Sequence, residues 1–94
     1  NTTALIYQLD IATGTTIRSF AAPALAPSGM AIDGRTLWLN DVTLRTTYQV
    51  SMITGTVIRS FVSPSTHPIG LAFDGRTLWL VDRDSDLVYQ IDIG

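Results

Sequence analysis

The chain alternates between short apolar stretches and groups of turn-forming residues. The four stretches in its middle part are residues 29–33, 36–41, 46–52 and 57–62, each bounded by Gly, Pro, Asp or Ser. This pattern is typical of short antiparallel strands joined by tight turns. Asp33-Gly34 separates the first two stretches and is a strong hairpin signal, because Gly accepts a positive φ and Asp tolerates it. The middle of the chain therefore predicts a four-stranded antiparallel unit.

The same pattern recurs every 41 residues without insertion or deletion. Tyr7, Tyr48 and Tyr89 mark the period, and the heptapeptide D-G-R-T-L-W-L occurs at residues 33–39 and 74–80. The tetrapeptide I-R-S-F occurs at residues 17–20 and 58–61. A fixed period in this range, built from short apolar stretches, is the signature of a propeller or solenoid repeat, whose single unit cannot bury both faces alone.

Applied to the whole chain, the period predicts nine strands in a single repeat domain over residues 1–94. They are expected at residues 4–11, 15–21, 29–33, 36–41, 46–52, 57–62, 70–73, 77–81 and 86–93. The domain divides into a partial unit at residues 1–28, a complete unit at 29–68 and a partial unit at 69–94. Pro lacks the N–H that a central strand must donate, so the stretches that contain Pro23, Pro27, Pro64 and Pro68 are predicted to be the links between units.

The distribution of apolar residues within the strands indicates how the units pack. The first two strands of each unit are apolar at nearly every position, so both of their faces should be covered, as in sheets stacked face to face. The third strand alternates instead. In its last copy, Leu87, Tyr89, Ile91 and Ile93 share one face, and Val88, Gln90 and Asp92 share the other.

Composition narrows the class of protein. Hydrophobic residues make up 46% of the chain and charged residues only 15%, so some apolar surface should be covered by another copy. Every acid is Asp and every base is Arg, and the net charge of −2 gives no basic patch for a nucleic acid. Without cysteine there is no disulfide or thiolate chemistry. No apolar run is long enough for membrane insertion. We expect a secreted or cell-surface protein.

One complete unit of the chain resembles a known repeat. It combines P-I-G-L-A-F-D-G-R-T-L-W-L-V-D-R-D-S-D-L-V-Y-Q-I-D-I at residues 68–93 with T-G-T-V-I-R-S-F at residues 54–61. It is similar to the blades of the YVTN/NHL type of β-propeller. The resemblance covers essentially the whole chain and implies an all-β fold of antiparallel four-stranded blades, about two per chain. The chain lacks the His and acidic ligands that enzymes of this group place at the central channel, so we expect no enzymatic activity and no cofactor.

The three copies of the third strand are unequal, which bears on assembly. The first and last copies, L-I-Y-Q-L-D-I at residues 5–11 and L-V-Y-Q-I-D-I at 87–93, agree closely, whereas the middle copy, T-T-Y-Q-V-S-M at 46–52, differs. With both chain ends inside a blade, we expect head-to-tail oligomerisation through exposed edge strands. The residues expected at these edges are Leu5, Tyr7, Leu9, Ile11, Leu87, Tyr89, Ile91 and Ile93.

These features predict a structural or scaffolding protein that assembles with other copies of itself into a ring or an extracellular filament. One alternative is an oligomeric propeller that binds a carbohydrate or peptide ligand. Another is a fragment of a longer propeller, natural or engineered. Long regular polymers would favour the scaffold, and a sugar ligand would favour the binding protein.

Two groups of residues are candidates for ligand binding. Asp82, Asp84 and Asp86 present carboxylates at alternate positions, as a Ca²⁺ loop does, although the motif's Gly and distal Glu are missing. A solvated turn is the other interpretation. Trp38 and Trp79 could stack on sugars, but each lies between two leucines and equally fits core packing between blades.

The remaining candidates favour structural roles. His67, the only histidine, has no second His or paired Ser nearby in sequence, and Ser19 and Ser60 have no base beside them. Four arginines recur with the period and could form ladders with Asp between neighbouring blades. They are Arg18, Arg35, Arg59 and Arg76. Asn1-Thr2-Thr3 matches an N-glycosylation sequon, which matters only in a secreted chain.

Overall fold

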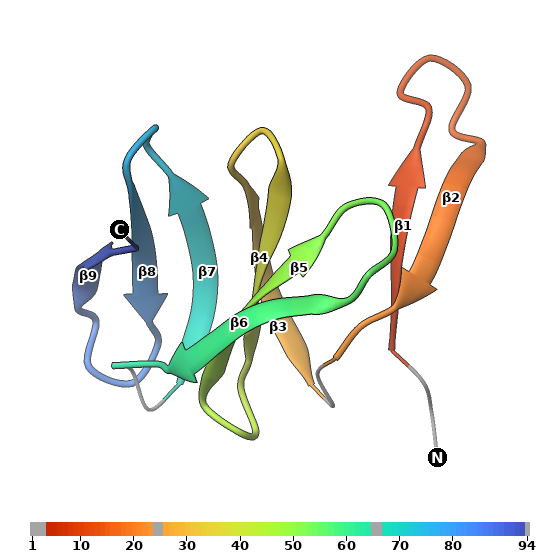
Figure 1. The fold of residues 1–94 in the computed structure, drawn as a ribbon. Coiled ribbons are helices and arrows are strands. Elements are labelled where there is room, and N and C mark those ends of the chain that lie inside the picture. Colours follow the sequence, from red (N-terminus) through yellow and green to blue (C-terminus); the bar gives the residue numbers. More distant parts are fainter. Residues whose placement is uncertain (1–3, 24–25, 65–66, 94) are drawn as a thin grey trace.

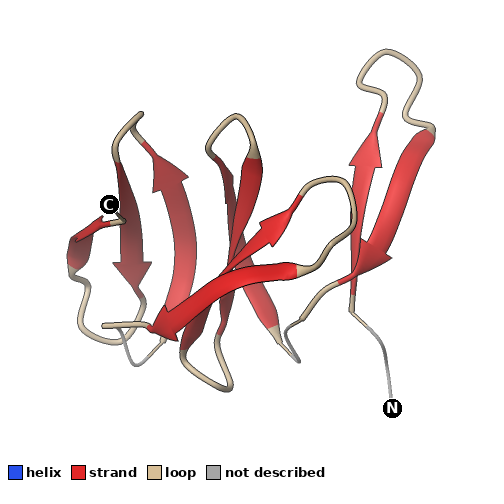
Figure 2. Cartoon of the chain, in the orientation of Figure 1, coloured by secondary structure: helices blue, strands red, loops and turns tan. Residues whose placement is uncertain are grey.

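The computed structural model describes residues 4–23, 26–64 and 67–93 of the chain. These residues form nine strands and no helix, as Figures 1 and 2 show. The strands are β1 (Leu5–Leu9), β2 (Thr16–Ala21), β3 (Pro27–Ile32), β4 (Thr36–Asp41), β5 (Thr46–Ser51), β6 (Val57–Val62), β7 (Pro68–Phe73), β8 (Thr77–Asp82) and β9 (Val88–Asp92). The predicted all-β class and the nine predicted strands are confirmed.

The strands form three antiparallel sheets in which sequence neighbours pair. The N-terminal sheet has the order β1-β2, the central sheet β3-β4-β5-β6 and the C-terminal sheet β7-β8-β9. Strand β3 of the central sheet lies beside β7 of the C-terminal sheet. In the part of the chain that the structure describes, β1 and β9 each pair with one strand only, so both are edge strands.

Two strand boundaries differ from the prediction. Pro27 and Pro68 were expected in the links, but each is the first residue of a strand and lies opposite an aspartate, Asp41 and Asp82 respectively. The first position of a strand tolerates Pro, because the missing N–H is not needed there. The register shifts just after each Pro, before Gly29 and Gly70, so the proline precedes a local irregularity in the ladder.

The predicted Asp-Gly hairpins are present at both positions. Gly34 has φ of 93° and Gly75 has φ of 102°, a left-handed conformation that favours glycine. The preceding aspartates, Asp33 and Asp74, accept hydrogen bonds from backbone N–H groups two and three residues later. The same turn chemistry therefore closes the first hairpin of the central and C-terminal sheets.

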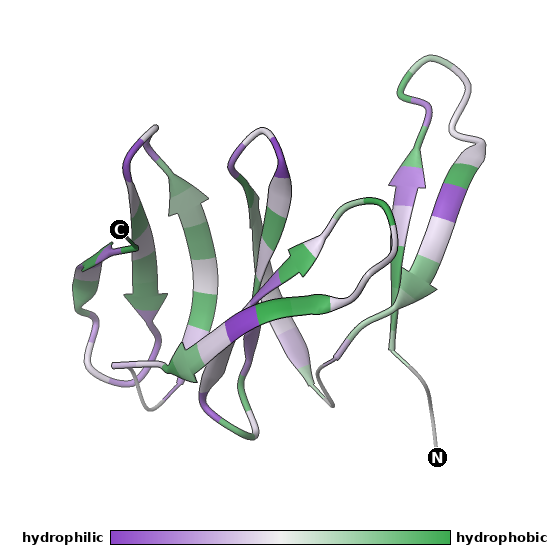
Figure 3. Ribbon diagram, viewed as in Figure 1, coloured by the Kyte–Doolittle hydropathy of each residue, from purple (hydrophilic) through white to green (hydrophobic). Residues whose placement is uncertain are grey.

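Strand β4 of the central sheet is buried on both faces, as its apolar sequence predicts. The same expectation is wrong for β3, β7 and β8, each of which leaves apolar side chains exposed. On one face, Leu37, Leu39 and Val50 pack against Ile6 of the N-terminal sheet. On the other, Trp38 and Ala31 cluster with Leu78 of the C-terminal sheet. Figure 3 shows hydrophobic bands along the strands of these sheets. Because β4 alternates, neighbouring residues serve opposite interfaces.

Arginines on β2 and β6 tie neighbouring sheets together, but not through the expected aspartates. Arg18 Nη1 donates to the carbonyl oxygen of Met52 at 3.2 Å. One period later, Arg59 Nη2 donates to the carbonyl oxygen of Ile93 at 2.6 Å. The predicted Arg–Asp ladder is therefore wrong for these two arginines. Both arginines instead bind carbonyl groups just beyond the third strand of the next sheet.

Two further sequence expectations concern the ends and the membrane. The candidate glycosylation residue Asn1 lies outside the described residues. Within them, the structure contains no helix long and apolar enough to cross a membrane.

Candidate functional site

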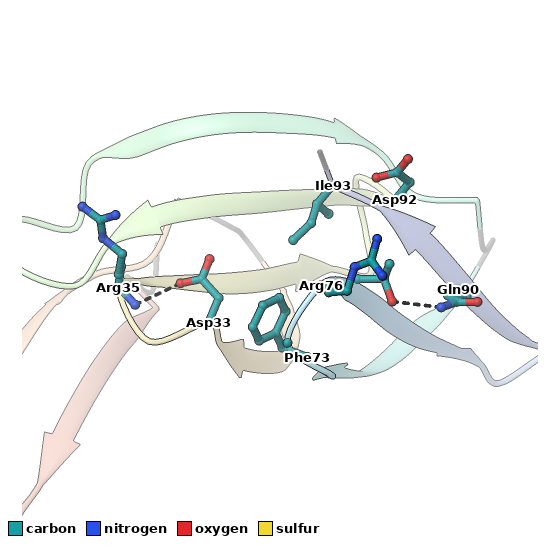
Figure 4. A pocket seen from close by; sticks show the side chains of 9 residues that line it. Asp33, Arg35, Phe73, Arg76, Gln90, Asp92 and Ile93 are labelled. Carbon is teal, nitrogen blue, oxygen red and sulfur yellow. Dashed lines mark hydrogen bonds between the residues drawn. The ribbon is translucent and has the colours of Figure 1, made fainter.

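A cleft of about 680 Å³ lies between the central and C-terminal sheets, at the end where their Asp-Gly turns meet. The turn of the central sheet contributes Asp33 and Arg35, and the turn of the C-terminal sheet contributes Arg76. Gln90 and Asp92 of β9 complete its polar side. Figure 4 shows the Arg35 guanidinium pointing away from that of Arg76. The cleft is polar, but its two cations do not converge on one point.

The aspartate of each Asp-Gly turn accepts hydrogen bonds from a threonine and a tryptophan of its own sheet. Asp33 Oδ2 accepts from the Thr36 hydroxyl at 2.7 Å and from the Trp38 indole N–H at 3.0 Å. One period later, Asp74 Oδ2 accepts from the Thr77 hydroxyl at 2.8 Å and from the Trp79 indole at 2.7 Å. Each carboxylate therefore fixes the orientation of a tryptophan five residues away.

The hydrogen bonds hold both carboxyl groups ionised. Burial disfavours the charged form of Asp33, but donors on Thr36, Arg35 and Trp38 outweigh it and lower the pKa of Asp33 to about 2. The pKa of Asp74 lies well below its usual range, chiefly because the Thr77 amide and then the Trp79 indole donate to the carboxylate. Neither group is suited to act as a proton donor near neutral pH.

We expect the Asp33 turn to make the stability of the fold depend on pH. The folded-state pKa is below the ordinary value of 3.8, so ionised Asp33 stabilises the fold above that pH, and the stabilisation is lost as pH falls through about 2. Asp33→Asn should therefore lower the melting temperature at pH 7 and have little effect at pH 2. Circular-dichroism melts at both pH values, with Asp10→Asn as a charge-matched control, test this. An equal loss at both values would contradict it.

A second group of interacting side chains surrounds Trp38, on the face of β4 and β5 that packs against the C-terminal sheet. Arg59 lies with its guanidinium carbon 5.1 Å from the centre of the Trp38 ring. Its Nε also donates to Gln49 Oε1 at 2.8 Å. The Phe61 ring is tilted at 47° to the indole, with centroids 6.2 Å apart. Arg59 and Phe61, both from β6, thus cover Trp38 on its own sheet.

The C-terminal sheet carries the same tryptophan and glutamine. Gln90 Nε2 donates to the Thr77 hydroxyl at 3.0 Å, just as Gln49 Nε2 donates to Thr36 at 2.9 Å. The two sheets differ in coverage, because Trp38 is 0% exposed and Trp79 is 37% exposed. The name Trp79 face is used below for the side of this sheet that carries Trp79, Val81, Val88 and Gln90, which lie opposite one another in the β8–β9 register.

The three candidate calcium ligands have different surroundings in this structure. Asp82 is buried and accepts hydrogen bonds from the Ser85 hydroxyl and the Asp84 amide. Asp84 Oδ2 instead lies 3.8 Å from His67 Nδ1. Asp86 follows in a left-handed conformation, with φ of 59°. No group of three metal-ligating side chains is found among the described residues.

The other sequence candidates are dispersed. Trp38 is fully buried and offers no face to a sugar, whereas Trp79 keeps part of its ring exposed. Ser19 and Ser60 lie on the exposed strands β2 and β6. His67 lies in the link before β7, and its backbone N–H donates to Asp82 Oδ1 at 3.2 Å.

The eight residues expected at the edge strands fall into two groups. Tyr89, Ile91 and Ile93 are half-buried, and the two isoleucines pack on the cluster around Trp38. The other five are exposed: Leu5, Tyr7, Leu9, Ile11 and Leu87. The alternation predicted for the last strand is confirmed for Tyr89 and Ile91, which face inward, and for Val88, Gln90 and Asp92, which face outward.

Sequence reasoning missed the glutamines that accompany the tryptophans. Gln8, Gln49 and Gln90 recur with the 41-residue period, directly after the tyrosines that define it. This recurrence could have revealed them. The buried pair Asn40 and Thr47, joined by a 2.9 Å hydrogen bond, was also missed, and the Asn40 amide nitrogen has no hydrogen-bond partner in the described chain.

Comparison with known proteins does not assign a family. The chain matches no protein-family model, and no curated protein matches it significantly.

Proposed function

We propose that this protein is a non-enzymatic structural repeat module of the β-propeller type, which assembles with further copies of itself into a ring or an extracellular filament. Its working surfaces are the outer faces and edge strands of the two terminal sheets. The propeller character rests on the 41-residue period, on the antiparallel four-stranded central sheet and on neighbouring sheets that pack face to face.

The difference between the two tryptophans carries this proposal. Trp38 and Trp79 occupy equivalent positions and make the same bond to an aspartate of their own turn. Leu78, Ile91 and Ile93 of the next sheet pack on the cluster that buries Trp38. The exposed Trp79 therefore has the local structure of an interface residue, and a further sheet of the same repeat fits its surroundings.

Substitutions around Trp79 support the same proposal. In the central sheet, the polar residues Asn40 and Thr47 lie opposite each other. At the equivalent positions of the C-terminal sheet stand Val81 and Val88, which are 40% and 61% exposed. Exposed valines do not stabilise a sheet face that stays in contact with water. The exposed Val81–Val88 pair therefore favours a Trp79 face that is covered in the assembled protein.

Sedimentation velocity over a range of concentrations, followed by negative-stain microscopy, tests this function. We expect species larger than the 10.2 kDa monomer, seen as closed rings or regular filaments. A chain that remains a folded monomer at the highest concentration would overturn the proposal. Circular dichroism on the same samples establishes that the chain is folded.

The cleft between the turns favours a second candidate function, the binding of a small polar ligand. Its volume is within the range of about 300–1,000 Å³ that is usual for ligand sites. Arg76 lines the cleft, and its guanidinium offers N–H donors that suit a carboxylate or a sugar hydroxyl. Thermal-shift screening of neutral and acidic sugars tests this, with Arg76→Ala expected to abolish any shift. If no sugar shifts the melting temperature, this candidate fails.

A further inference from the structure

We propose that β9 and Trp79 accept strand β2 from a second copy of this chain, forming a composite four-stranded sheet with the order β7-β8-β9-β2 of the partner. This inference rests on the proposed self-assembly and names the surfaces that make it. In the central sheet, β6 occupies the place that we assign to the incoming strand.

The central sheet shows what the fourth strand supplies. Arg59 bonds to Gln49 and lies over the Trp38 ring, and Phe61 packs against the same ring. Both residues come from the I-R-S-F segment of β6. This segment therefore supplies three contacts: a hydrogen-bond donor for the glutamine oxygen, a cation over the indole ring and an aromatic ring that packs against the indole.

The C-terminal sheet holds the receiving half of the same arrangement. The bond from Trp79 to Asp74 fixes the indole, and the bond from Gln90 Nε2 to Thr77 fixes the glutamine. Among the described residues, Gln90 donates through Nε2 to Thr77, and its Oε1 occupies the position at which Gln49 Oε1 accepts from Arg59 in the central sheet. Because both side chains are already oriented, binding a strand here orders few additional groups.

Strand β2 is the occupant that matches these groups. It carries the identical segment I-R-S-F at residues 17–20, and most of its residues are exposed. The pairing of β5 with β6, moved by one period, opposes Gln90 to the partner's Arg18 and Val88 to the partner's Phe20. Arg18 and Phe20 of the partner then contact Trp79 as Arg59 and Phe61 contact Trp38.

The exchange keeps the ladder of β2, because β9 replaces β1 as its neighbour, while β1 is released and Ile6 loses its burial. The two strands differ only by Val for Ile and Ile for Leu over the seven residues 5–11 and 87–93. Val88 stands at the position of Ile6, which is buried against the central sheet. Contacts from β2 to its own central sheet, such as the Arg18 bond to Met52, are kept. The gain is burial of Trp79 and Val88.

Disulfide trapping between single-cysteine variants tests this pairing, since the chain has no cysteine of its own. The proposed register sets Tyr89 opposite Ser19 of the partner. Opposed Cα atoms in antiparallel strands are about 4.5–5.5 Å apart, within disulfide reach. Mixing Tyr89→Cys with Ser19→Cys, one chain isotopically labelled, should yield a mixed disulfide dimer detectable by mass. If Tyr89→Cys does not fold, Leu87→Cys with Ala21→Cys probes the same register.

The matched control uses the second copy of the segment. Ser60 is the equivalent of Ser19, but its neighbour β5 is held between β4 and β6, whereas the neighbour of Ser19, β1, pairs with β2 alone among the described strands. Because β9 can replace β1 but not β5, Tyr89→Cys with Ser60→Cys should lose the mixed dimer. Equal cross-linking in both mixtures would overturn the inference. Sedimentation of the same samples separates two failures: assembly without the specific cross-link refutes this pairing alone, whereas absence of assembly refutes the proposed function as well.

Discussion

Trp38→Ala is expected to lower the free energy of unfolding by about 3–5 kcal/mol, the usual cost of removing a large buried aromatic side chain. Trp38 is fully buried, and its loss also removes the indole bond to Asp33 and the partner of Arg59. Urea denaturation followed by circular dichroism measures the change. If the variant does not fold, Trp38→Phe retains a ring and should show a smaller loss.

Trp79→Ala provides the matched comparison. At concentrations where the chain sediments as a monomer, this variant should lose about 1–2 kcal/mol at most, because the side chain is already 37% exposed. Similar losses for both variants would mean that Trp79 is as deeply packed in the monomer as Trp38. A larger loss for Trp79→Ala under assembling conditions alone would agree with burial of Trp79 between copies.

Gly29→Ala is the second substitution with a large expected effect, a loss of about 1–3 kcal/mol from overpacking. A Cβ at Gly29 would lie 3.0 Å from the Gly70 Cα and 3.1 Å from the Ile69 carbonyl oxygen. Both are backbone atoms of β7, so relief requires β3 and β7 to move apart. Chemical denaturation measures the loss in stability.

Gly70→Ala is the control for this close approach. A Cβ at Gly70 would have only one neighbour, Val81 Cβ at 4.0 Å. We expect its stability to be unchanged or slightly raised, because Ala loses less conformational freedom than Gly on folding. If Gly70→Ala is as destabilising as Gly29→Ala, steric contact between β3 and β7 is not the reason that Gly29 must be a glycine.

Local features of the sequence were sufficient to predict the strands and their turns. The apolar stretches, the Asp33-Gly34 and Asp74-Gly75 dipeptides and the 41-residue period each concern residues close together in the chain. Propensity, turn geometry and hairpin register depend on such neighbours. The errors at Pro27 and Pro68 are also local, because the strand needs no N–H at its first residue.

The candidate site was predictable only in part. The 41-residue period identified Arg35, Arg76 and the two tryptophans as candidates. It did not identify the groups that these side chains contact. Arg18 and Arg59 were expected to find aspartates and instead bind carbonyl oxygens 34 residues away. A partner at that separation depends on how one sheet is set against the next, which no local pattern encodes.

By itself, the sequence determined the all-β class, the nine strands and their antiparallel order, because these follow from periodicity and turn chemistry. Only the tertiary structure decided that two tryptophans with the same local sequence and the same aspartate bond differ in burial. Burial depends on which sheet packs against a face, so equal sequences in unequal surroundings acquire different roles: Trp38 in the core, and Trp79 at an exposed face.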